Sequence, residues 1–367
     1  MIGEHVLITG GAGFIGSHVA DELLRAGHRV RALDLLVDQV HGDARRPPYL
    51  AEEIELVVGD VRDADTVRRA LEGVDSVVHL AARVGVGQSM YEPAEYAAAN
   101  TVGTGVLLEA LLEQPVRKLV VASSMSIYGE GAYEPAPASE RTREQLECGE
   151  WEPRGPTGEE LRPVPTPETK EPALASVYAL TKYDQERMGL LYGAAYGVPT
   201  VALRFFNVYG PRQALSNPYT GVLAIFAARL LNGRAPVVYE DGGQRRDFVH
   251  VRDVARACRL ALERDGADGQ ALNVGSGRGT TVLDIAERLA RVLDTPVAPE
   301  LPGTFRAGDI RHCFADVTRA REELEFAAEV ELDNGLAELG AWLEGQTATD
   351  RFEQAAAELR ERGLTQR

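Results

Sequence analysis

Cysteine is scarce in this sequence. Three of the 367 residues are cysteine (Cys148, Cys258 and Cys313), and their spacing fits neither a zinc site nor a disulfide framework. We therefore expect no bound metal and a reducing, cytoplasmic location. The chain also lacks an uninterrupted apolar run of membrane-spanning length, and its first residues lead into a strand-like run without signal-peptide features. These absences predict that the protein neither crosses a membrane nor is exported.

Basic residues are outnumbered by acidic ones. The chain has 39 Lys and Arg against 56 Asp and Glu, which gives a formal net charge of −17 at pH 7. Such a surface disfavours non-specific binding to nucleic acid or to an anionic membrane, so we expect neither as a partner. An anionic ligand would have to be bound by particular arginines and by helix N-termini.

A regular alternation of short apolar runs and helical patterns fills the first half of the chain. The runs expected to be strands are His5–Ile8, Val30–Leu33, Leu56–Val58, Val74–His79 and Leu119–Ala122. This alternation is typical of a parallel sheet with helices on both faces. The length leaves room for a second, smaller unit. The sequence thus predicts an α/β protein with a Rossmann-type doubly wound parallel sheet and a smaller mixed α/β lobe.

The pattern changes between residues 130 and 172, where Pro, Gly and Glu accumulate. Such a stretch cannot sustain a long helix or a central strand, so we interpret it as a surface insertion, called the insertion below. Helical spacing resumes at about Ser176–Tyr196, and a strand at Thr200–Phe205 is expected to return to the sheet. Further helices are expected near Leu223–Leu231, Val251–Glu263 and Val282–Leu293.

A glycine-rich loop, Thr9-Gly-Gly-Ala-Gly-Phe-Ile-Gly16, joins the first strand to the first helix. In that position a dinucleotide's diphosphate can rest on the helix N-terminus with no side chain in the way. Asp34 ends the second strand, where a carboxylate accepts both ribose hydroxyls and repels a 2′-phosphate. The combination of strand, helix and acidic residue disfavours the alternative interpretation of the loop as an ordinary tight turn. Because Asp34 would repel a 2′-phosphate, we expect NAD and not NADP as the cofactor. The contacts expected here are Gly10, Gly13, Phe14, Ile15, Gly16 and Asp34.

A tyrosine and a lysine lie four residues apart on one face of a predicted helix, Tyr178 and Lys182. An ammonium beside a phenol stabilises the phenolate, so this spacing suits proton transfer. Ser124 lies just beyond the fifth strand, at the edge of the sheet where ligands bind. We predict these three residues to be catalytic. The alternatives are a core tyrosine beside an exposed lysine, and a simple serine turn.

Several segments together resemble the extended short-chain dehydrogenase/reductases of the NAD-dependent epimerase/dehydratase family. They are the glycine loop, Gly59-Asp-Val61, His79-Leu-Ala-Ala82, Ser123-Ser-Met-Ser-Ile-Tyr-Gly129 and Tyr178-x-x-x-Lys182, and the likeness covers roughly residues 5–345. The resemblance implies that Asp60 and Val61 hold the adenine and that Leu80, Ala81 and Ala82 line the cofactor cleft. It also implies that Lys182, with Asn100 nearby, contacts the nicotinamide ribose. A buried hydrogen bond is an equally good interpretation of Asn100.

The resemblance continues in the second half of the chain and implies a nucleotide-sugar substrate. It places Asn207 near the diphosphate, and Arg246, Arg306 and Asp309 at the diphosphate and nucleoside ribose. Guanidinium groups suit phosphate oxygens. The remaining substrate contacts expected are Ser124, Met125, Ser126 and Arg212.

These assignments divide the chain into an NAD-binding domain (1–185), which includes the insertion, and a mainly nucleotide-sugar-binding lobe (186–345). A charged tail (346–367), expected as a solvated helix or a frayed end, follows. The family's helical dimer interface implies a homodimer.

The sequence departs from the family at three points. The insertion lengthens the span between Ser124 and Tyr178, and either a lid over the sugar or a passive surface loop would explain it. Many UDP-galactose epimerases have a lysine near the position of Val84, which weakens an assignment to galactose. Related UDP-glucuronate epimerases often have an arginine at the position of Ala214, so Arg212 or another base would have to bind a carboxylate.

The predicted activity is epimerisation at carbon 4 of a UDP-hexose or UDP-hexuronate, such as UDP-glucose or UDP-glucuronate, through a 4-keto intermediate with tightly bound NAD. A dTDP-6-deoxyhexose such as dTDP-rhamnose is the alternative substrate. The rival activities are 4,6-dehydration and decarboxylation. Related dehydratases have Asp and Glu where this chain has Met125 and Ser126, which favours epimerisation. A non-catalytic regulator is disfavoured, because the glycine loop and the Ser/Tyr/Lys set are intact.

Overall fold

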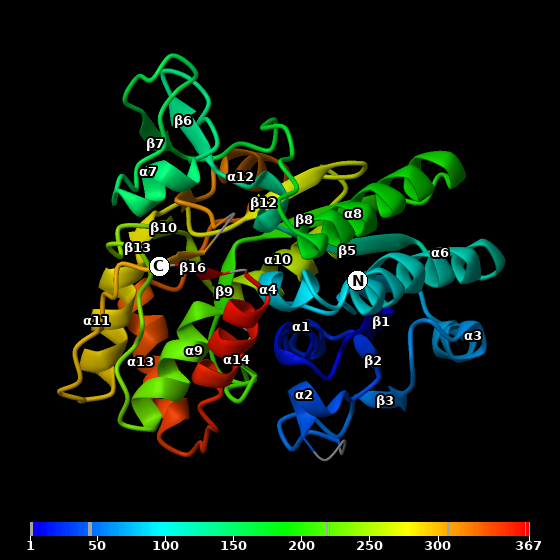
Figure 1. Ribbon diagram of the computed structural model, residues 1–367. Coiled ribbons are helices and arrows are strands. Elements are labelled where there is room, and N and C mark those ends of the chain that lie inside the picture. Colours follow the sequence, from blue (N-terminus) through cyan, green and yellow to red (C-terminus); the bar gives the residue numbers. More distant parts are fainter. Residues whose placement is uncertain are drawn as a thin grey trace.

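The computed structural model describes residues 3–42, 46–217, 219, 221–306, 309–363 and 365–366, without the side chains of 306, 365 and 366. Seven parallel strands form its central sheet, which grows outward from β1 in both directions (Figure 1). In spatial order they are β12 (Ala271–Val274), β8 (Thr200–Phe205), β5 (Lys118–Ser124), β4 (Ser76–His79), β1 (His5–Thr9), β2 (Arg29–Asp34) and β3 (Glu55–Val58). The Rossmann-type doubly wound fold is confirmed.

Helices cover both faces of the sheet. One face carries α1 (Phe14–Arg25), α10 (Val251–Glu263) and α12 (Thr318–Leu324). The other carries α3 (Ala64–Leu71), α6 (Gly103–Glu113) and α8 (Val177–Tyr196). Shorter turns follow the strand ends, namely α2 (Asp38–His41), α4 (Val86–Ser89), α5 (Pro93–Tyr96), a π-helical turn at Ala97–Val102 and a 3₁₀ turn at Met125–Tyr128. Every residue of β5 is buried, as expected for a central strand covered on both faces.

The helix that carries Tyr178 and Lys182 has clear start and stop signals. The Ser176 hydroxyl accepts the N–H of Ala179 at 3.1 Å and caps the N-terminus of α8. Gly197, with a φ of 69°, ends the helix in the left-handed conformation. Between these ends, Gly189 and Gly193 are buried and allow the helix to pack closely on the sheet.

A second lobe has its own hydrophobic core, built from α9 (Val222–Leu231), α11 (Val282–Val292) and α13 (Leu332–Leu343). Its short strands form three small sheets. They are β9 (Asn207–Tyr209) with β11 (Phe248–His250), then β10 (Arg245–Arg246) between β13 (Thr280–Thr281) and β15 (His312–Cys313), and β14 (Phe305–Arg306) with β16 (Thr365–Gln366). Within the described residues, no helix is both long and apolar enough to span a bilayer.

Three features differ from the expectations or add to them. β12, which the sequence analysis did not identify, extends the sheet beyond β8. The insertion contains a hairpin of β6 (Ala132–Glu134) and β7 (Arg162–Val164) and the short helix α7 (Arg143–Glu147), which project from the body (Figure 1). The C-terminal tail is a packed helix, α14 (Phe352–Glu361), because Ala355 and Leu359 are buried.

A buried ion pair joins α8 to β8 and gives a stability prediction. Arg204 donates to Glu186 at 2.7 and 2.9 Å, and the side chains of these two residues are 8% and 1% exposed. Arg204→Met would leave the Glu186 carboxylate buried without its cation, so we expect a loss of about 3–5 kcal/mol in the free energy of unfolding. Urea unfolding measures this loss. The double variant Arg204→Met/Glu186→Gln should lose less, and an equal or greater loss would contradict the assignment.

Candidate active site

The glycine loop between β1 and α1 forms one end of a cavity of about 600 Å³. A β-carbon at Gly10, which has a φ of 71°, would lie 3.0 Å from the backbone N of Ala81. At Gly16 it would lie 2.1 Å from the carbonyl oxygen of Gly10. Gly13 has only one neighbour at 3.4 Å, so its face of the loop is open. A ligand's diphosphate can therefore approach the start of α1, as the residue pattern predicts.

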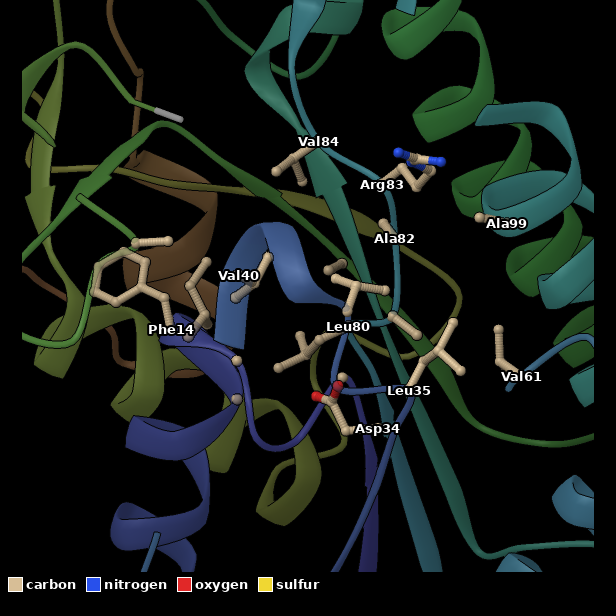
Figure 2. Close-up of a pocket in the computed structure, with 18 of the residues that line it drawn as sticks. Phe14, Asp34, Leu35, Val40, Val61, Leu80, Ala82, Arg83, Val84 and Ala99 are labelled. Carbon is tan, nitrogen blue, oxygen red and sulfur yellow. The ribbon is translucent and has the colours of Figure 1, made fainter. Parts of the chain in front are cut away.

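Asp34 lies at the end of β2 and lines the same cavity (Figure 2). Its carboxylate accepts the N–H of Ala12 at 3.0 Å and the N–H of Leu36 at 2.9 Å. These two bonds fix the carboxylate beside the glycine loop. A negative charge held there suits ribose hydroxyls and disfavours a 2′-phosphate, so the donors and acceptors present fit NAD.

The cavity brings together most of the predicted cofactor and catalytic residues. Those that line it are Gly10, Gly13, Phe14, Ile15, Gly16, Asp34, Asp60, Val61, Leu80, Ala81, Ala82, Ser124, Tyr178 and Lys182. They come from the carboxyl ends of the central strands and from α8, and Figure 2 shows several of them around the open space. The carboxyl edge of an open α/β sheet is where ligands bind, and a cavity of this size is large enough for a cofactor.

Ser124 and Tyr178 both line the cavity. Burial raises the pKa of Tyr178 above its ordinary value, and a hydrogen bond with the Ser124 side chain opposes the rise. The Ser126 hydroxyl donates to the Ser124 oxygen at 2.9 Å, which leaves the Ser124 proton free for another acceptor. The lowering of the Tyr178 pKa that the Tyr/Lys spacing predicts is therefore absent from this structure.

Lys182 is held by a buried amide. Its Nζ donates to the Gln185 Oε1 at 2.6 Å, and Gln185 Nε2 in turn contacts Thr104 Oγ1 at 2.9 Å and His79 Nε2 at 3.1 Å. Burial lowers the pKa of Lys182 to about 7, against the opposing effect of the Glu186 carboxylate. Burial thus makes the ammonium form of Lys182 less favourable than in an exposed lysine.

Other predicted residues lie outside the cavity lining. Asn100 is fully buried, accepts the N–H of Arg83 at 2.7 Å and donates to Thr181 at 2.9 Å, which matches the buried hydrogen bond given above as its alternative. Met125 and Ser126 are buried in the turn after β5. Among the described atoms, the Asn207 Oδ1 is buried without a hydrogen-bond partner.

Arg212 and Arg246 are also absent from the described lining of the cavity. Arg212 pairs with Asp21 at 2.8 Å, and its guanidinium lies 5.3 Å from the centre of the Tyr49 ring. Arg246 pairs with Asp309 at 3.4 Å on the second lobe. The side chain of Arg306 lies outside the described residues. No group of three or more His, Cys, Asp or Glu side chains in the described part of the chain is arranged to hold a metal ion.

The sequence analysis missed several polar residues at the cavity, among them Gln39, Gln88 and Asn217. Gln39 donates to Gln88 at 3.2 Å and to Asn217 at 3.0 Å, which joins three separate segments. Gln39 and Gln88 follow β2 and β4, so the rule that ligands bind at the carboxyl edge could have indicated them. Nothing in the sequence around Asn217 indicates its position.

The sequence model of the NAD dependent epimerase/dehydratase family matches residues 6–275. The chain belongs to this family. Membership agrees with the glycine loop, Asp34 and the Ser/Tyr/Lys set described above, and it confirms NAD as the cofactor.

Relatives in this family include nucleotide-sugar 4-epimerases, a UDP-N-acetyl-alpha-D-glucosaminuronate decarboxylase and a dTDP-glucose 4,6-dehydratase. The dTDP-L-rhamnose 4-epimerase of Burkholderia thailandensis is 37% identical over 350 residues, which cover 93% of this chain and 95% of that protein. The structure of Thermotoga maritima UDP-glucose 4-epimerase with UDP-glucose has a TM-score of 0.77 and 32% identity, and the match covers 93% of this chain and 98% of that one. The Thermus thermophilus UDP-glucose 4-epimerase complex with NAD has a TM-score of 0.75 and 32% identity, covering 94% and 100%.

The lowered pKa of Lys182 gives a pH-dependent prediction. In the folded protein this pKa is about 7, whereas that of an unfolded lysine is about 10.4. Unfolding between these values takes up a proton, so the contribution of Lys182 to the free energy of unfolding grows with pH, by at most about 1.4 kcal/mol per pH unit. We expect the wild type to gain stability relative to Lys182→Met as the pH rises from about 7 to about 9. Urea unfolding at several pH values tests this, and a constant difference between the two proteins would contradict it.

Proposed function

We propose that this protein inverts the configuration at carbon 4 of a nucleotide-linked sugar by a reversible oxidation at that carbon. The observation that carries the proposal is that Ser124, Tyr178 and Lys182 line the same cavity as the glycine loop. A phenol and a hydroxyl so placed can share the proton of one sugar hydroxyl.

The residues of the chain would handle the proton. Tyr178 would accept the proton of the 4-hydroxyl, and Ser124 would hold the same oxygen by a hydrogen bond. Because burial raises the pKa of Tyr178, the phenolate needs a nearby positive charge, and a protonated Lys182 one helical turn away would supply part of it. Bound NAD supplies a reversible hydride acceptor. Rotation of the keto sugar before reduction would then invert carbon 4.

The carboxylates near the cavity favour epimerisation over dehydration. Loss of water across carbons 5 and 6 needs an acid and a base at the sugar. The acids in the described lining already have partners: Asp34 accepts two backbone N–H groups, and Asp60 and Glu95 pair with arginines. In the insertion, Glu130 accepts the backbone N–H groups of residues 311 and 312.

The charges at the cavity also bear on the substituent at carbon 5. The arginines in the described lining are Arg62, paired with Asp60 at 2.6 Å, and Arg83, paired with Glu95 at 3.3 Å. Arg212, the expected reader of a carboxylate, instead pairs with Asp21. Each of these three arginines already has a carboxylate partner, so we propose a neutral hexose or a 6-deoxyhexose.

Two nucleotide sugars fit this description. A dTDP-6-deoxyhexose comes first, supported by the 37% identity with the Burkholderia enzyme over nearly the whole chain. A UDP-hexose comes second, supported by the similarity to the Thermotoga structure that contains UDP-glucose. The two classes differ both in the base and at carbon 6, so product analysis separates them.

Incubation of NAD-loaded protein with dTDP-L-rhamnose, UDP-glucose and dTDP-glucose, followed by product analysis, tests the function. We expect the carbon-4 epimer of at least one sugar, and no 4-keto-6-deoxy product from UDP-glucose or dTDP-glucose. Tyr178→Phe should lower kcat by about 10²-fold to 10⁴-fold and change KM little, because it removes the proton acceptor and little contact area. Tyr196→Phe, on the exposed end of α8, is the control. Accumulation of a 4-keto-6-deoxy sugar from UDP-glucose or dTDP-glucose would overturn the proposal, because that product requires loss of water across carbons 5 and 6.

We also propose a homodimer formed through α6 and α8. These helices lie side by side and expose large apolar side chains, including Leu112 at 48% and Leu191 at 60% (Figure 1). Two such pairs can pack as a four-helix bundle.

The dimer proposal predicts that Leu112→Glu/Leu191→Glu elutes as a monomer in light-scattering chromatography, whereas the wild type elutes as a dimer. Leu301→Glu, at a position 48% exposed on the second lobe, should leave the mass unchanged. A monomeric wild type would refute the proposal.

A further inference from the structure

The insertion packs against the second lobe and contributes none of the described residues that line the cavity. Its two ends bond to the segment around β15. Gly131 donates its N–H to the carbonyl of His312 at 2.7 Å, and Thr166 donates to the carbonyl of Phe314 at 2.7 Å. The insertion is therefore fixed to residues 309–316, and neither of its expected roles, a lid over the sugar or a passive loop, accounts for this contact.

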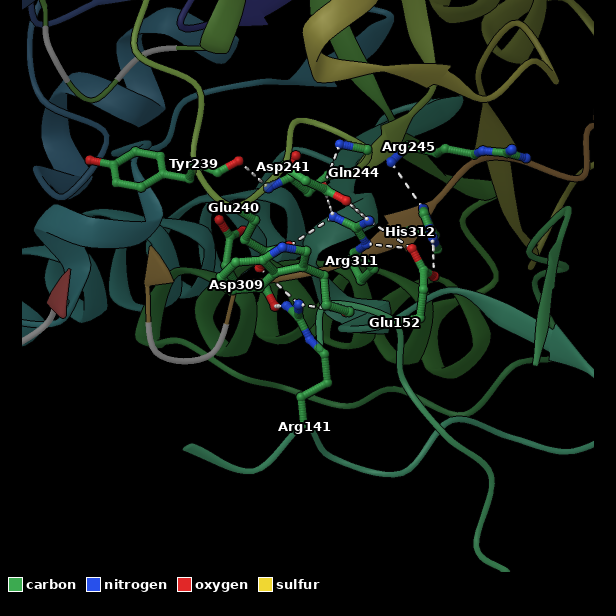
Figure 3. Close-up of polar contacts among 12 residues, drawn as sticks. Arg141, Glu152, Tyr239, Glu240, Asp241, Gln244, Arg245, Asp309, Arg311 and His312 are labelled. Atoms are coloured by element: carbon green, nitrogen blue, oxygen red, sulfur yellow. Dashed lines mark hydrogen bonds and ion pairs between the residues drawn. The ribbon is translucent and has the colours of Figure 1, made fainter. Parts of the chain in front are cut away.

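Arg141 of the insertion joins three segments of the chain (Figure 3). Its Nη1 donates to Glu240 Oε1 at 2.8 Å, and its Nη2 donates to the carbonyl oxygen of Asp309 at 2.7 Å. The side chains of Arg141 and Glu240 are 5% and 1% exposed. Buried charge-assisted bonds of this kind hold their partners in one geometry, because separating them leaves a desolvated charge.

Glu152 makes the second connection from the insertion. One of its oxygens accepts from Arg311 at 2.6 and 2.9 Å, and the other contacts His312 Nε2 at 2.9 Å. His312 Nδ1 accepts the N–H of Arg245 at 3.0 Å, so the ring proton lies on Nε2 and points to Glu152. Arg311 also donates to Glu240 and Asp241. We call Arg141, Glu152, Glu240, Asp241 and Arg311 the Arg141–Arg311 cluster.

The segment that the cluster holds is the one that orients Arg246. The Arg246 guanidinium donates to the carbonyl of Arg311 at 3.0 Å, to the carbonyl of Ile310, and to the Asp309 carboxylate at 3.4 Å. Its own strand, β10, and the neighbouring β13 and β15 have two residues each. Strands this short do not fix a side chain by their ladder alone. The carbonyl groups of Ile310 and Arg311, which accept hydrogen bonds from Arg246, therefore depend on contacts with other segments. The insertion supplies such contacts through Arg141 and Glu152.

We propose that Arg141 and Glu152 are positioning residues for nucleotide binding: they hold residues 309–312, and so Arg246 and Asp309, which the family resemblance implies contact the diphosphate and the nucleoside ribose. This inference rests on the proposed function, which makes a nucleotide sugar the substrate. The insertion then sets the affinity for the nucleotide half of the substrate, and the reaction at the sugar proceeds without it.

Calorimetric titration of NAD-loaded protein with UDP and with dTDP tests the inference. Arg141→Gln should weaken binding of whichever nucleotide the wild type binds by about tenfold, the value of one well-made ionic contact. Glu152→Gln retains most of the packing and should have a smaller effect in the same direction. The Kd for NAD and kcat at saturating substrate should stay within about twofold of wild type, and KM should rise. The exposed pair in the same insertion, Arg143 and Glu147, provides the matched controls Arg143→Gln and Glu147→Gln, which should leave all four values unchanged.

A double-mutant cycle separates positioning from simple loss of stability. If Arg141 acts through Arg246, then Arg141→Gln should weaken nucleotide binding little further in an Arg246→Gln background. Additive losses would refute action through Arg246. Unchanged nucleotide affinity in Arg141→Gln, with a lowered Tm, would make the cluster a structural anchor only and overturn the inference. A fall in kcat at constant KM would indicate a lid and would also overturn it. If the wild type binds neither nucleotide, the proposed function fails and this inference fails with it.

Discussion

The close packing of α8 on the central sheet determines where the reactive side chains lie. A β-carbon at Gly189 would lie 2.8 Å from the Val121 side chain, and one at Gly193 would lie 2.5 Å from Thr200 Oγ1. Because no side chain separates the helix from β5 and β8 at these positions, the first turns of α8 lie over the carboxyl end of β5. There Tyr178 and Ser124 line the same cavity. The Glu186–Arg204 pair fixes the rotation of the helix about its axis.

The parts of the site that the sequence predicts are those with local signals. The glycine loop, Asp34 and the strand ends follow from spacing along one strand–helix–strand unit, and the structure places them around one cavity. The Tyr178–Lys182 pair follows from helical periodicity in the same way. The carboxyl-edge rule then relates these segments to one another, since neighbouring parallel strands end at the same side of a sheet.

The parts that could not be predicted depend on contacts between segments far apart in the chain. The pKa values of Tyr178 and Lys182 are set by burial, which residue spacing does not report. Arg212 has a φ of 71°, and its side chain pairs with Asp21 on α1. The sequence motif around Arg212 does not indicate this side-chain orientation. The insertion was recognised by its composition, but its attachment through Arg141 is a non-local ion pair that leaves no local pattern.

The strand order of the sheet has a consequence for how the chain folds during synthesis. The edge of β5 is covered by β8, and the edge of β8 is covered in turn by β12, which ends at Val274. Until the ribosome has released that residue, the nascent chain exposes an apolar strand edge, which is the kind of surface that pairs with other chains and aggregates. Pairing across such long sequence separations is also slow. The first half of the chain thus depends on the second for its solubility during translation.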